Sequence, residues 1–294
     1  MTGSVRRATL AGTVSIGLWS TLALLTRLAG NIPPFQLLAM TFSIAFILML
    51  SKWLWCRQSL SMVLRQPWPV WLLGVGGLFG YHLFYFIALA NAPVVEASLI
   101  AYLWPLLIVL LSSLLPGNRL QLRHLGGALL AFFGVWLLLG RGSGFQVAYL
   151  PGYLAAAVCA LIWSGYSVLS RLVSQVPTDA VGGFCGVTAI LGLISHALWE
   201  TTVWPLDAVQ WLGVIGLGLG PMGLAFFTWD YAVKHGNLQL LGVLAYAAPL
   251  LSTLLLVLVG MVEPGMNLLF SSLAISGAAL FASLGLPARR RAGN

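Results

Sequence analysis

Aromatic and imidazole side chains near the centres of long apolar runs are the groups of this chain that could do chemistry. In a membrane, tryptophan and tyrosine usually lie at the two interfaces, so rings at mid-depth require polar partners or a water-filled cavity. Such rings can stack on an apolar solute or face an ammonium group, while hydroxyl and imidazole groups can bind a carboxylate. The residues that we expect to bind a small uncharged or zwitterionic solute are Trp19, Tyr81, His82, Tyr85, Tyr102, Trp104, Trp163, Phe226, Trp229 and Tyr246.

Simpler interpretations exist for several of these side chains. A ring can fill the space between helices without touching any solute. His82 can bind a substrate carboxylate or relay a proton, or it can be a neutral imidazole bonded to a neighbouring hydroxyl. Asp230 follows Trp229 and is expected to pair with Lys234, four residues later on the same helix face. Since no Lys or Arg is expected deep in any apolar run, strongly anionic solutes are disfavoured.

Three prolines are candidate hinges. Pro105 and Pro249 each remove one helical hydrogen bond, and each should kink the helix that carries a tyrosine three residues earlier. Pro221 ends the sequence Gly216-x-Gly218-x-Gly220-Pro221, which should bend or break its helix. The freed carbonyl groups must then be satisfied by neighbouring helices or by water in a cavity.

Composition narrows the class of protein. Of the 294 residues, 60% are hydrophobic and 7% charged, with a mean hydropathy of +0.98. Soluble domains carry about a quarter charged residues, so this chain is a polytopic membrane protein whose partner is the lipid bilayer. The net charge of +8 comes from short links between apolar runs, which argues against nucleic-acid binding.

Enzymatic chemistry is disfavoured by an inventory of the polar residues. The chain has six acidic residues and no His-Glu-x-x-His motif, and its three cysteines have no metal-like spacing. We therefore expect no catalytic residues, no bound metal and no cofactor.

Ten apolar runs are long enough to span a bilayer, which needs about 20 residues per helix. They cover residues 8–28, 34–55, 68–90, 94–115, 120–140, 151–173, 180–200, 207–233, 238–259 and 266–286. Lys and Arg collect at the ends expected to be cytoplasmic, from Arg6 and Arg7 to Arg289, Arg290 and Arg291, with Arg27 and Arg141 as the exceptions. Both termini are predicted to be cytoplasmic.

The two halves of the chain repeat each other. Trp19-Ser20 with Arg27 recurs as Trp163-Ser164 with Arg171, a shift of 144 residues, the difference between 163 and 19. The same shift lays Tyr102 and Pro105 on Tyr246 and Pro249. Five spans per half is an odd number, so the halves 1–146 and 147–294 should cross the membrane in opposite directions. Inverted repeats of this kind are typical of secondary transporters, which bind solute near the midplane.

The Trp-Ser segment that opens each half, and Ala-Tyr-x-x-Pro-Leu-Leu in the fourth helix of each, resemble the EamA-type members of the drug/metabolite transporter superfamily. The resemblance covers essentially the whole chain. It implies an all-α fold of ten transmembrane helices in two inverted five-helix repeats around a central cavity, with the fifth and tenth helices at the periphery.

The residues and the resemblance together predict an inner-membrane exporter of amino acids with aromatic or other neutral, apolar side chains, working by alternating access. A monomer is expected. One alternative is an exporter of lipophilic drugs or cationic dyes, and another is a membrane scaffold or sensor that transports nothing.

Overall fold

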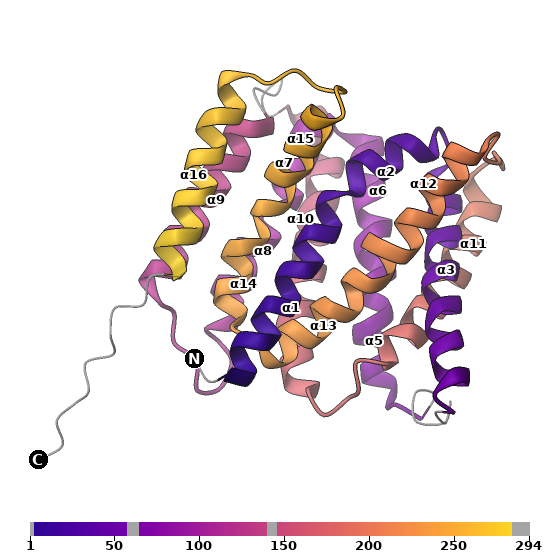
Figure 1. Ribbon diagram of the computed structural model, residues 1–294, viewed down its shortest axis with the longest axis horizontal. Coiled ribbons are helices and arrows are strands. Elements are labelled where there is room, and N and C mark those ends of the chain that lie inside the picture. The colour runs from indigo at the N-terminus through magenta and orange to yellow at the C-terminus, as the bar shows by residue number, and fades with distance from the viewer. Residues whose placement is uncertain (1–2, 58–64, 140–145, 284–294) are drawn as a thin grey trace, which may run out of the picture.

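The computed structural model describes residues 3–57, 65–139 and 146–283, which form ten helical spans long and apolar enough to cross a membrane. The spans run nearly side by side (Figure 1). Those of the first half are α1 (Gly3–Ser20) with α2 (Leu22–Ala29), α3 (Pro34–Trp55), α5 (Trp68–Val75) with η1 (Gly76–Gly80) and α6 (Tyr81–Asn91), α7 (Val94–Ala101) with α8 (Trp104–Ser112), and α9 (Leu122–Leu139).

The second half continues in the same pattern. Its spans are η2 (Val147–Tyr149), α10 (Leu150–Leu169) and η3 (Ser170–Val173), then α11 (Ala180–Trp199), α12 (Ala208–Leu219) with η4 (Gly220–Leu224) and α13 (Ala225–His235), α14 (Leu238–Ala245) with α15 (Ala247–Leu258), and α16 (Met266–Ser283). The predicted number and order of spans are confirmed for the described residues. Arg141 and Arg289 to Arg291, used above to orient the chain, lie outside those residues.

Several spans are interrupted, and most interruptions obey the shift of 144 residues. The π-helical turn Gly76–Gly80 corresponds position for position to the π-helical turn Gly220–Leu224, and α6 corresponds to α13. The fourth span breaks at Tyr102 and the ninth at Tyr246, as the prolines three residues later predict. The break at Thr21 in the first span was not predicted, and α10 passes its counterpart position without a break.

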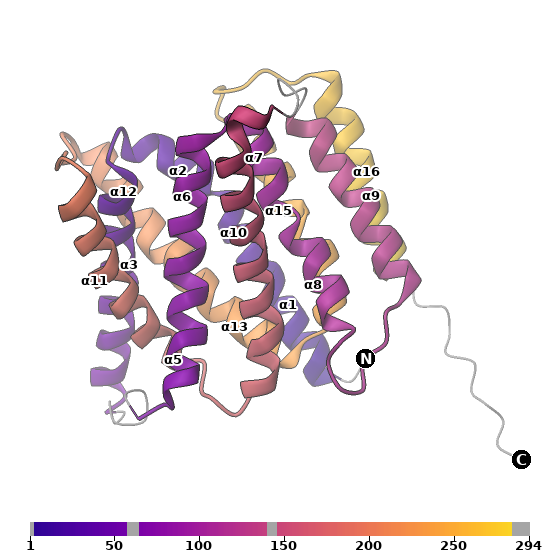
Figure 2. The same cartoon turned by 180° about the vertical axis from the view of Figure 1, so that it is seen from behind.

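Helices of the two halves pair with one another in a symmetric way (Figures 1 and 2). The second spans pack together as α3 and α11, the fourth and ninth as α8 and α14, and the fifth and tenth as α9 and α16. The contact between α1 and α13 is matched by the contact between α10 and α6. When the two halves are exchanged, the α3–α11 and α9–α16 contacts map onto themselves, and the contact of α1 with α13 maps onto that of α10 with α6. This is expected for two inverted repeats related by a pseudo-two-fold axis in the membrane plane.

We call the end of the bundle at which α1 begins the N-terminal end, and the opposite end the distal end. Figure 1 shows them at the bottom and the top. The α9 and α16 pair stands at the periphery, where Gly127 and Gly134 lie close to Ala278 and Ile275 of α16. Large apolar side chains on the outer surface of this pair are exposed, for example Trp136 and Leu280, as suits contact with lipid.

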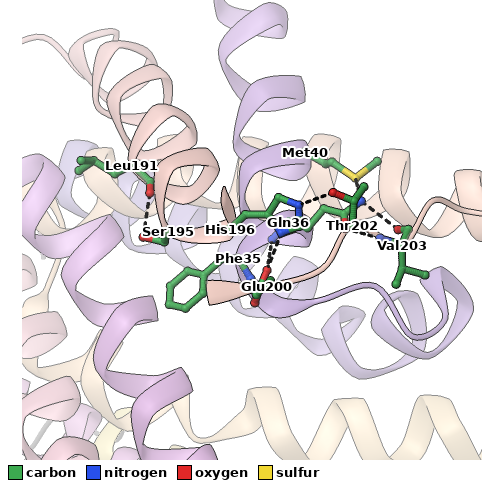
Figure 3. Close-up of polar contacts among 9 residues, drawn as sticks. All are labelled: Phe35, Gln36, Met40, Leu191, Ser195, His196, Glu200, Thr202 and Val203. Carbon is green, nitrogen blue, oxygen red and sulfur yellow. Dashed lines mark hydrogen bonds and ion pairs between the residues drawn. The ribbon is translucent and has the colours of Figure 1, made fainter. Parts of the chain in front are cut away.

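Polar interactions link α3 and α11 at both ends of the pair. At the distal end the Glu200 carboxylate accepts hydrogen bonds from the backbone N–H groups of Phe35 (2.9 Å) and Gln36 (3.0 Å), which begin α3 (Figure 3). His196 Nδ1 lies 2.9 Å from the same carboxylate. At the N-terminal end Lys52 pairs with Asp179 at 2.6 Å. Because a carboxylate satisfies the free N–H groups of a helix start, Glu200 links the end of α11 to the start of α3.

Candidate functional site

A cavity of about 680 Å³ lies between the two halves. Its walls come from α1, α2, α3, α6, α7 and α8 of the first half and from α10, α12, η4, α13 and α15 of the second. At the distal end the lining includes Thr26, Arg27 and Pro34, all of which are exposed. The residues of the N-terminal helix ends do not contribute to the lining, so the cavity opens at the distal end and ends blindly near mid-depth.

A cluster of five aromatic rings, which we call the aromatic floor, lies at the blind end of the cavity, and four of the five line it. They are brought together from four spans, and their members are Trp19, Trp104, Trp163, Phe226 and Trp229. Trp19 lies at the centre, with its ring centroid 5.0 Å from that of Trp229 and 5.7 Å from that of Trp163. Most of these contacts are edge-to-face, the arrangement that the aromatic quadrupole favours.

Two parallel tyrosine rings line the wall above the floor. Tyr81 and Tyr85 are one helical turn apart on α6, with centroids 5.9 Å apart and planes inclined by 8°. Tyr81 also contacts Trp163 of the floor at 5.6 Å. Tyr102 lines the cavity from the break in the fourth span. The wall therefore offers flat apolar faces together with phenolic hydroxyl groups.

His82 is buried among aromatic rings and has a defined tautomer. Its Nδ1 lies 2.7 Å from the Leu78 carbonyl oxygen. A carbonyl can only accept, so Nδ1 carries the proton, and in the neutral ring Nε2 remains an acceptor. Phe42 meets the imidazole edge-on at 5.4 Å and fixes its plane. His82 can thus accept a hydrogen bond from a donor such as an ammonium group. The neighbouring hydroxyl expected as its partner is replaced by a backbone carbonyl.

Beneath the aromatic floor the N-terminal half of the bundle is closed by a buried polar network. Asp230 and Lys234 form an ion pair at 2.8 Å, as predicted from their spacing. Asp230 also accepts a hydrogen bond from Thr178 at 2.7 Å, and Lys234 donates to the Val176 carbonyl at 3.0 Å. Both charged side chains are almost fully buried, and such burial is tolerated only because each has several partners.

Of the ten residues predicted to bind solute, those that line the cavity are Trp19, Tyr81, His82, Tyr85, Tyr102, Trp104, Trp163 and Phe226. Trp229 and Tyr246 lie outside the lining and are fully buried. Trp229 is the member of the aromatic floor that does not face the cavity, and its Nε1 donates to the Ser167 hydroxyl at 3.0 Å. The Tyr246 hydroxyl accepts a hydrogen bond from the backbone N–H of Leu106 at 3.2 Å. Its place is therefore behind the wall, not in it, contrary to the expectation that it faces the cavity.

The three candidate hinge prolines lie at interruptions of their spans. Pro105 follows the break at Tyr102, Pro249 follows the break at Tyr246, and Pro221 lies inside the π-helical turn η4. The carbonyl oxygen of Pro221 accepts a hydrogen bond from Trp19 Nε1 at 3.2 Å, which ties the centre of the floor to this turn. Their role as hinges stays a prediction.

Some lining residues were not predicted. The polar ones among them are four short side chains and one cation, namely Thr26, Thr41, Ser98, Ser252 and Arg27. Isolated Ser and Thr residues in apolar runs give no distinctive pattern in a sequence. Arg27 did carry a signal, because its recurrence as Arg171 marks a position that both repeats retain. Its exception to the cytoplasmic clustering of Lys and Arg placed it at the outer end of its span, and its side chain lines the mouth of the cavity.

The profile of the EamA-like transporter family matches residues 7–140 and again residues 150–284. The chain belongs to this family. Each match covers one of the two structural repeats, so the family unit is five spans and the chain carries two of them. The site is accordingly that of a transporter and not of an enzyme.

Individual relatives agree with this assignment. The chain is 54% identical over 280 residues to the aromatic amino acid exporter YddG of Ancylobacter novellus, covering 94% of this chain and 97% of the relative. It is 27% identical to the aromatic amino acid exporter YddG of Escherichia coli, covering 85% of this chain and 87% of that one. The pseudopaline exporter CntI of Pseudomonas aeruginosa is 25% identical, with coverages of 76% and 77%.

A protein of known crystal structure is similar to the chain throughout. The TM-score is 0.90 at 53% identity, with 94% of this chain and 97% of that chain covered. Ten apolar helices and membership in a family of transporters make the chain a multi-pass protein of the inner membrane.

Proposed function

We propose that this EamA-like transporter exports amino acids with aromatic or other neutral, apolar side chains. The observation that carries the proposal is the aromatic cavity between the two repeats, open at one end of the bundle and closed at the other. Its volume of about 680 Å³ lies within the range of roughly 300 to 1,000 Å³ typical of sites for small ligands. The two relatives named above as aromatic amino acid exporters support the same substrate class.

The lining suits both ends of a zwitterionic amino acid. The side chain of the solute would stack against the aromatic floor, chiefly Trp19 and Trp163. The ammonium group would donate to His82 Nε2 and lie over the face of Tyr81 or Tyr85, a contact worth about 0.5 to 2 kcal/mol. Phenolic hydroxyl groups of the wall would donate to the carboxylate. Among the described residues the lining contains no Asp, Glu or Lys, so it offers a solute no fixed negative charge.

We propose alternating access as the mechanism, with the other helices of repeats 1–146 and 147–294 moving against each other around the α3 and α11 pair. Pro105, Pro221 and Pro249 lie where interrupted helices could bend. The inverted arrangement of the repeats supports this mechanism, because exchanging their conformations would close the distal end and open the other. Each cycle requires one chain only, so we propose a monomer.

The N-terminal end is proposed to face the cytoplasm. In the described part of the chain, the end at which α1 begins carries most of the Lys and Arg residues, for example Arg6, Arg7, Lys52 and Arg123. Arg27 lies at the distal end. Positive residues are retained on the cytoplasmic side during insertion, which supports cytoplasmic termini and a distal end that faces outward.

Counterflow in liposomes tests the proposal. Protein is reconstituted into vesicles loaded with unlabelled phenylalanine, and uptake of labelled phenylalanine is followed with and without a pH gradient. We expect transient accumulation that unlabelled tryptophan and leucine inhibit. Accumulation of a cationic dye without competition by amino acids would instead identify a drug exporter, which the cation-binding faces of Tyr81 and Tyr85 would also allow. Vesicles that accumulate neither solute would contradict transport altogether.

A further inference from the structure

The closed N-terminal end contains a clamp made by one arginine. A single guanidinium nitrogen of Arg171 donates to the carbonyl oxygens of Val233 at 3.2 Å and Gly236 at 2.6 Å. These two carbonyls lie at the C-terminal end of α13, which ends at His235. The last carbonyls of a helix lack intrahelical partners and carry partial negative charge, so a cation is favoured there. The clamp joins the end of the sixth span to the end of the eighth.

The counterpart of this clamp in the first repeat is open. Subtracting 144 converts Arg171, Val233 and Gly236 into Arg27, Leu89 and Ala92. Helix α6 ends at Asn91, as α13 ends at His235, so Leu89 and Ala92 hold the equivalent places at a helix end. Arg27 is exposed, and its side chain makes no hydrogen bond or ion pair to any described residue. Arg27 and Leu89 both line the mouth of the cavity.

Other positions around the clamp show the same contrast. Tyr166, Val176, Thr178 and Asp230 are packed or hydrogen-bonded in the closed N-terminal end. Their counterparts by the same shift, which all line the open cavity, are Leu22, Ile32, Pro34 and Phe86.

Charge is retained at one of these positions and lost at others. Phe86 and Ala90 stand where the second repeat has the Asp230 and Lys234 ion pair, so the first repeat cannot reproduce that network. Arg27 keeps the charge of Arg171. Of the polar interactions that close the N-terminal end, the arginine clamp is therefore one for which the first repeat retains the charged residue.

We propose that Arg27 is the clamp of the distal end: when the repeats exchange conformations, its guanidinium donates to the carbonyls of Leu89 and Ala92 and holds the cavity shut against the outside. This inference rests on the proposed alternating access. It assigns to Arg27 a role in positioning the two helix ends and not in binding the transported solute. In the state described here the clamp is released and the mouth is open.

Two symmetry-matched pairs of spin labels test the proposal in the full chain reconstituted in liposomes. Asn31→Cys with Asn91→Cys reports the distal end, and the counterparts Gln175→Cys with His235→Cys report the N-terminal end. All four positions are exposed, and Cys56, the exposed native cysteine, is replaced by Ser. Distance distributions are measured by pulsed electron spin resonance with and without phenylalanine. Each pair is combined with Arg27→Gln, Arg27→Lys or Arg171→Gln.

The wild-type chain is expected to populate a long and a short distance at the distal pair. Because hydrogen bonds to charged groups are strong, Arg27→Gln should lower the ratio of short to long distances about tenfold or more, whereas Arg171→Gln should raise it. Arg27→Lys should recover part of the short distance that Arg27→Gln loses. The lysine ammonium keeps the positive charge but lacks the planar fork of donors in a guanidinium, so it should bind only one of the two carbonyls. If the wild type shows counterflow and two distances, but Arg27→Gln leaves the ratio of short to long distances unchanged, the clamp is overturned and alternating access is not. A single distance at both pairs, without counterflow, overturns alternating access and the clamp together.

Discussion

The Tyr246 hydroxyl accepts a hydrogen bond from the backbone N–H of Leu106 across the interface between the two repeats, with the oxygen 3.2 Å from the nitrogen. Leu106 directly follows Pro105, at the point where the fourth span is interrupted. An N–H freed by a helix break in a membrane must find a partner, because the bilayer core offers no water. The tyrosine of the second repeat thus stabilises the kink of the first.

Tyr246→Phe is therefore expected to destabilise the protein without changing the cavity. The substitution leaves the Leu106 N–H unpaired in a buried place, at a cost of about 1 to 3 kcal/mol. Thermal unfolding of the detergent-solubilised protein measures the effect. Tyr102→Phe is the matched control, because Tyr102 occupies the same place in the first repeat but lines the cavity. The control should unfold at nearly the wild-type temperature, and an equal loss in both variants would contradict the assignment.

His82→Phe is expected to weaken solute binding by removing the acceptor at Nε2 while retaining a ring among Phe42, Phe86 and Phe226. A hydrogen bond to a charged group contributes about 1.5 to 3 kcal/mol, so the KM for phenylalanine in counterflow should rise about tenfold or more. His124→Phe serves as the comparison, since His124 bonds Gln239 away from the cavity. Normal KM values in His82→Phe would remove His82 from the binding site.

Asp230→Asn should destabilise the closed N-terminal end much more than a comparable change at the surface. Removing one partner of a buried ion pair leaves Lys234 with an uncompensated charge, which costs about 3 to 5 kcal/mol. Asp179→Asn removes the Lys52 pair, whose side chains are 47% and 23% exposed, and should cost about 1 kcal/mol or less. Chemical unfolding of both variants ranks them, and a reversed order would show that the Asp230 network does not support the closed end.

The shift of 144 residues made much of this fold predictable. The shift predicts proline breaks at equivalent positions of the fourth and ninth spans, and it aligns the interrupted third span with the interrupted eighth. Both follow because helix interruptions depend on local residues that the two repeats share. The positions of Trp19, Trp163 and His82 around one cavity were also predictable, since mid-span polar and aromatic residues must face away from lipid.

Differences between the repeats could not be predicted in the same way. The repeat in the sequence predicts the same environment for Tyr102 and Tyr246, and likewise for Arg27 and Arg171. A cavity open at one end breaks that symmetry, so one member of each pair faces the cavity while the other is packed away. The break at Thr21 belongs to the same asymmetry, because its counterpart lies in the continuous helix α10.

Exchange of conformations between the repeats is tested most directly by a pair of counterpart residues. Ser252 lines the open cavity, whereas its counterpart Ile108 is fully buried in the closed half. Ser252→Cys and Ile108→Cys, each with Cys56→Ser, are treated with a membrane-impermeant maleimide from one side of oriented vesicles at a time, during phenylalanine counterflow. We expect Ser252→Cys to react only from the outer side and Ile108→Cys only from the cytoplasmic side. An Ile108→Cys variant that transports phenylalanine yet never reacts from the cytoplasm would contradict the exchange.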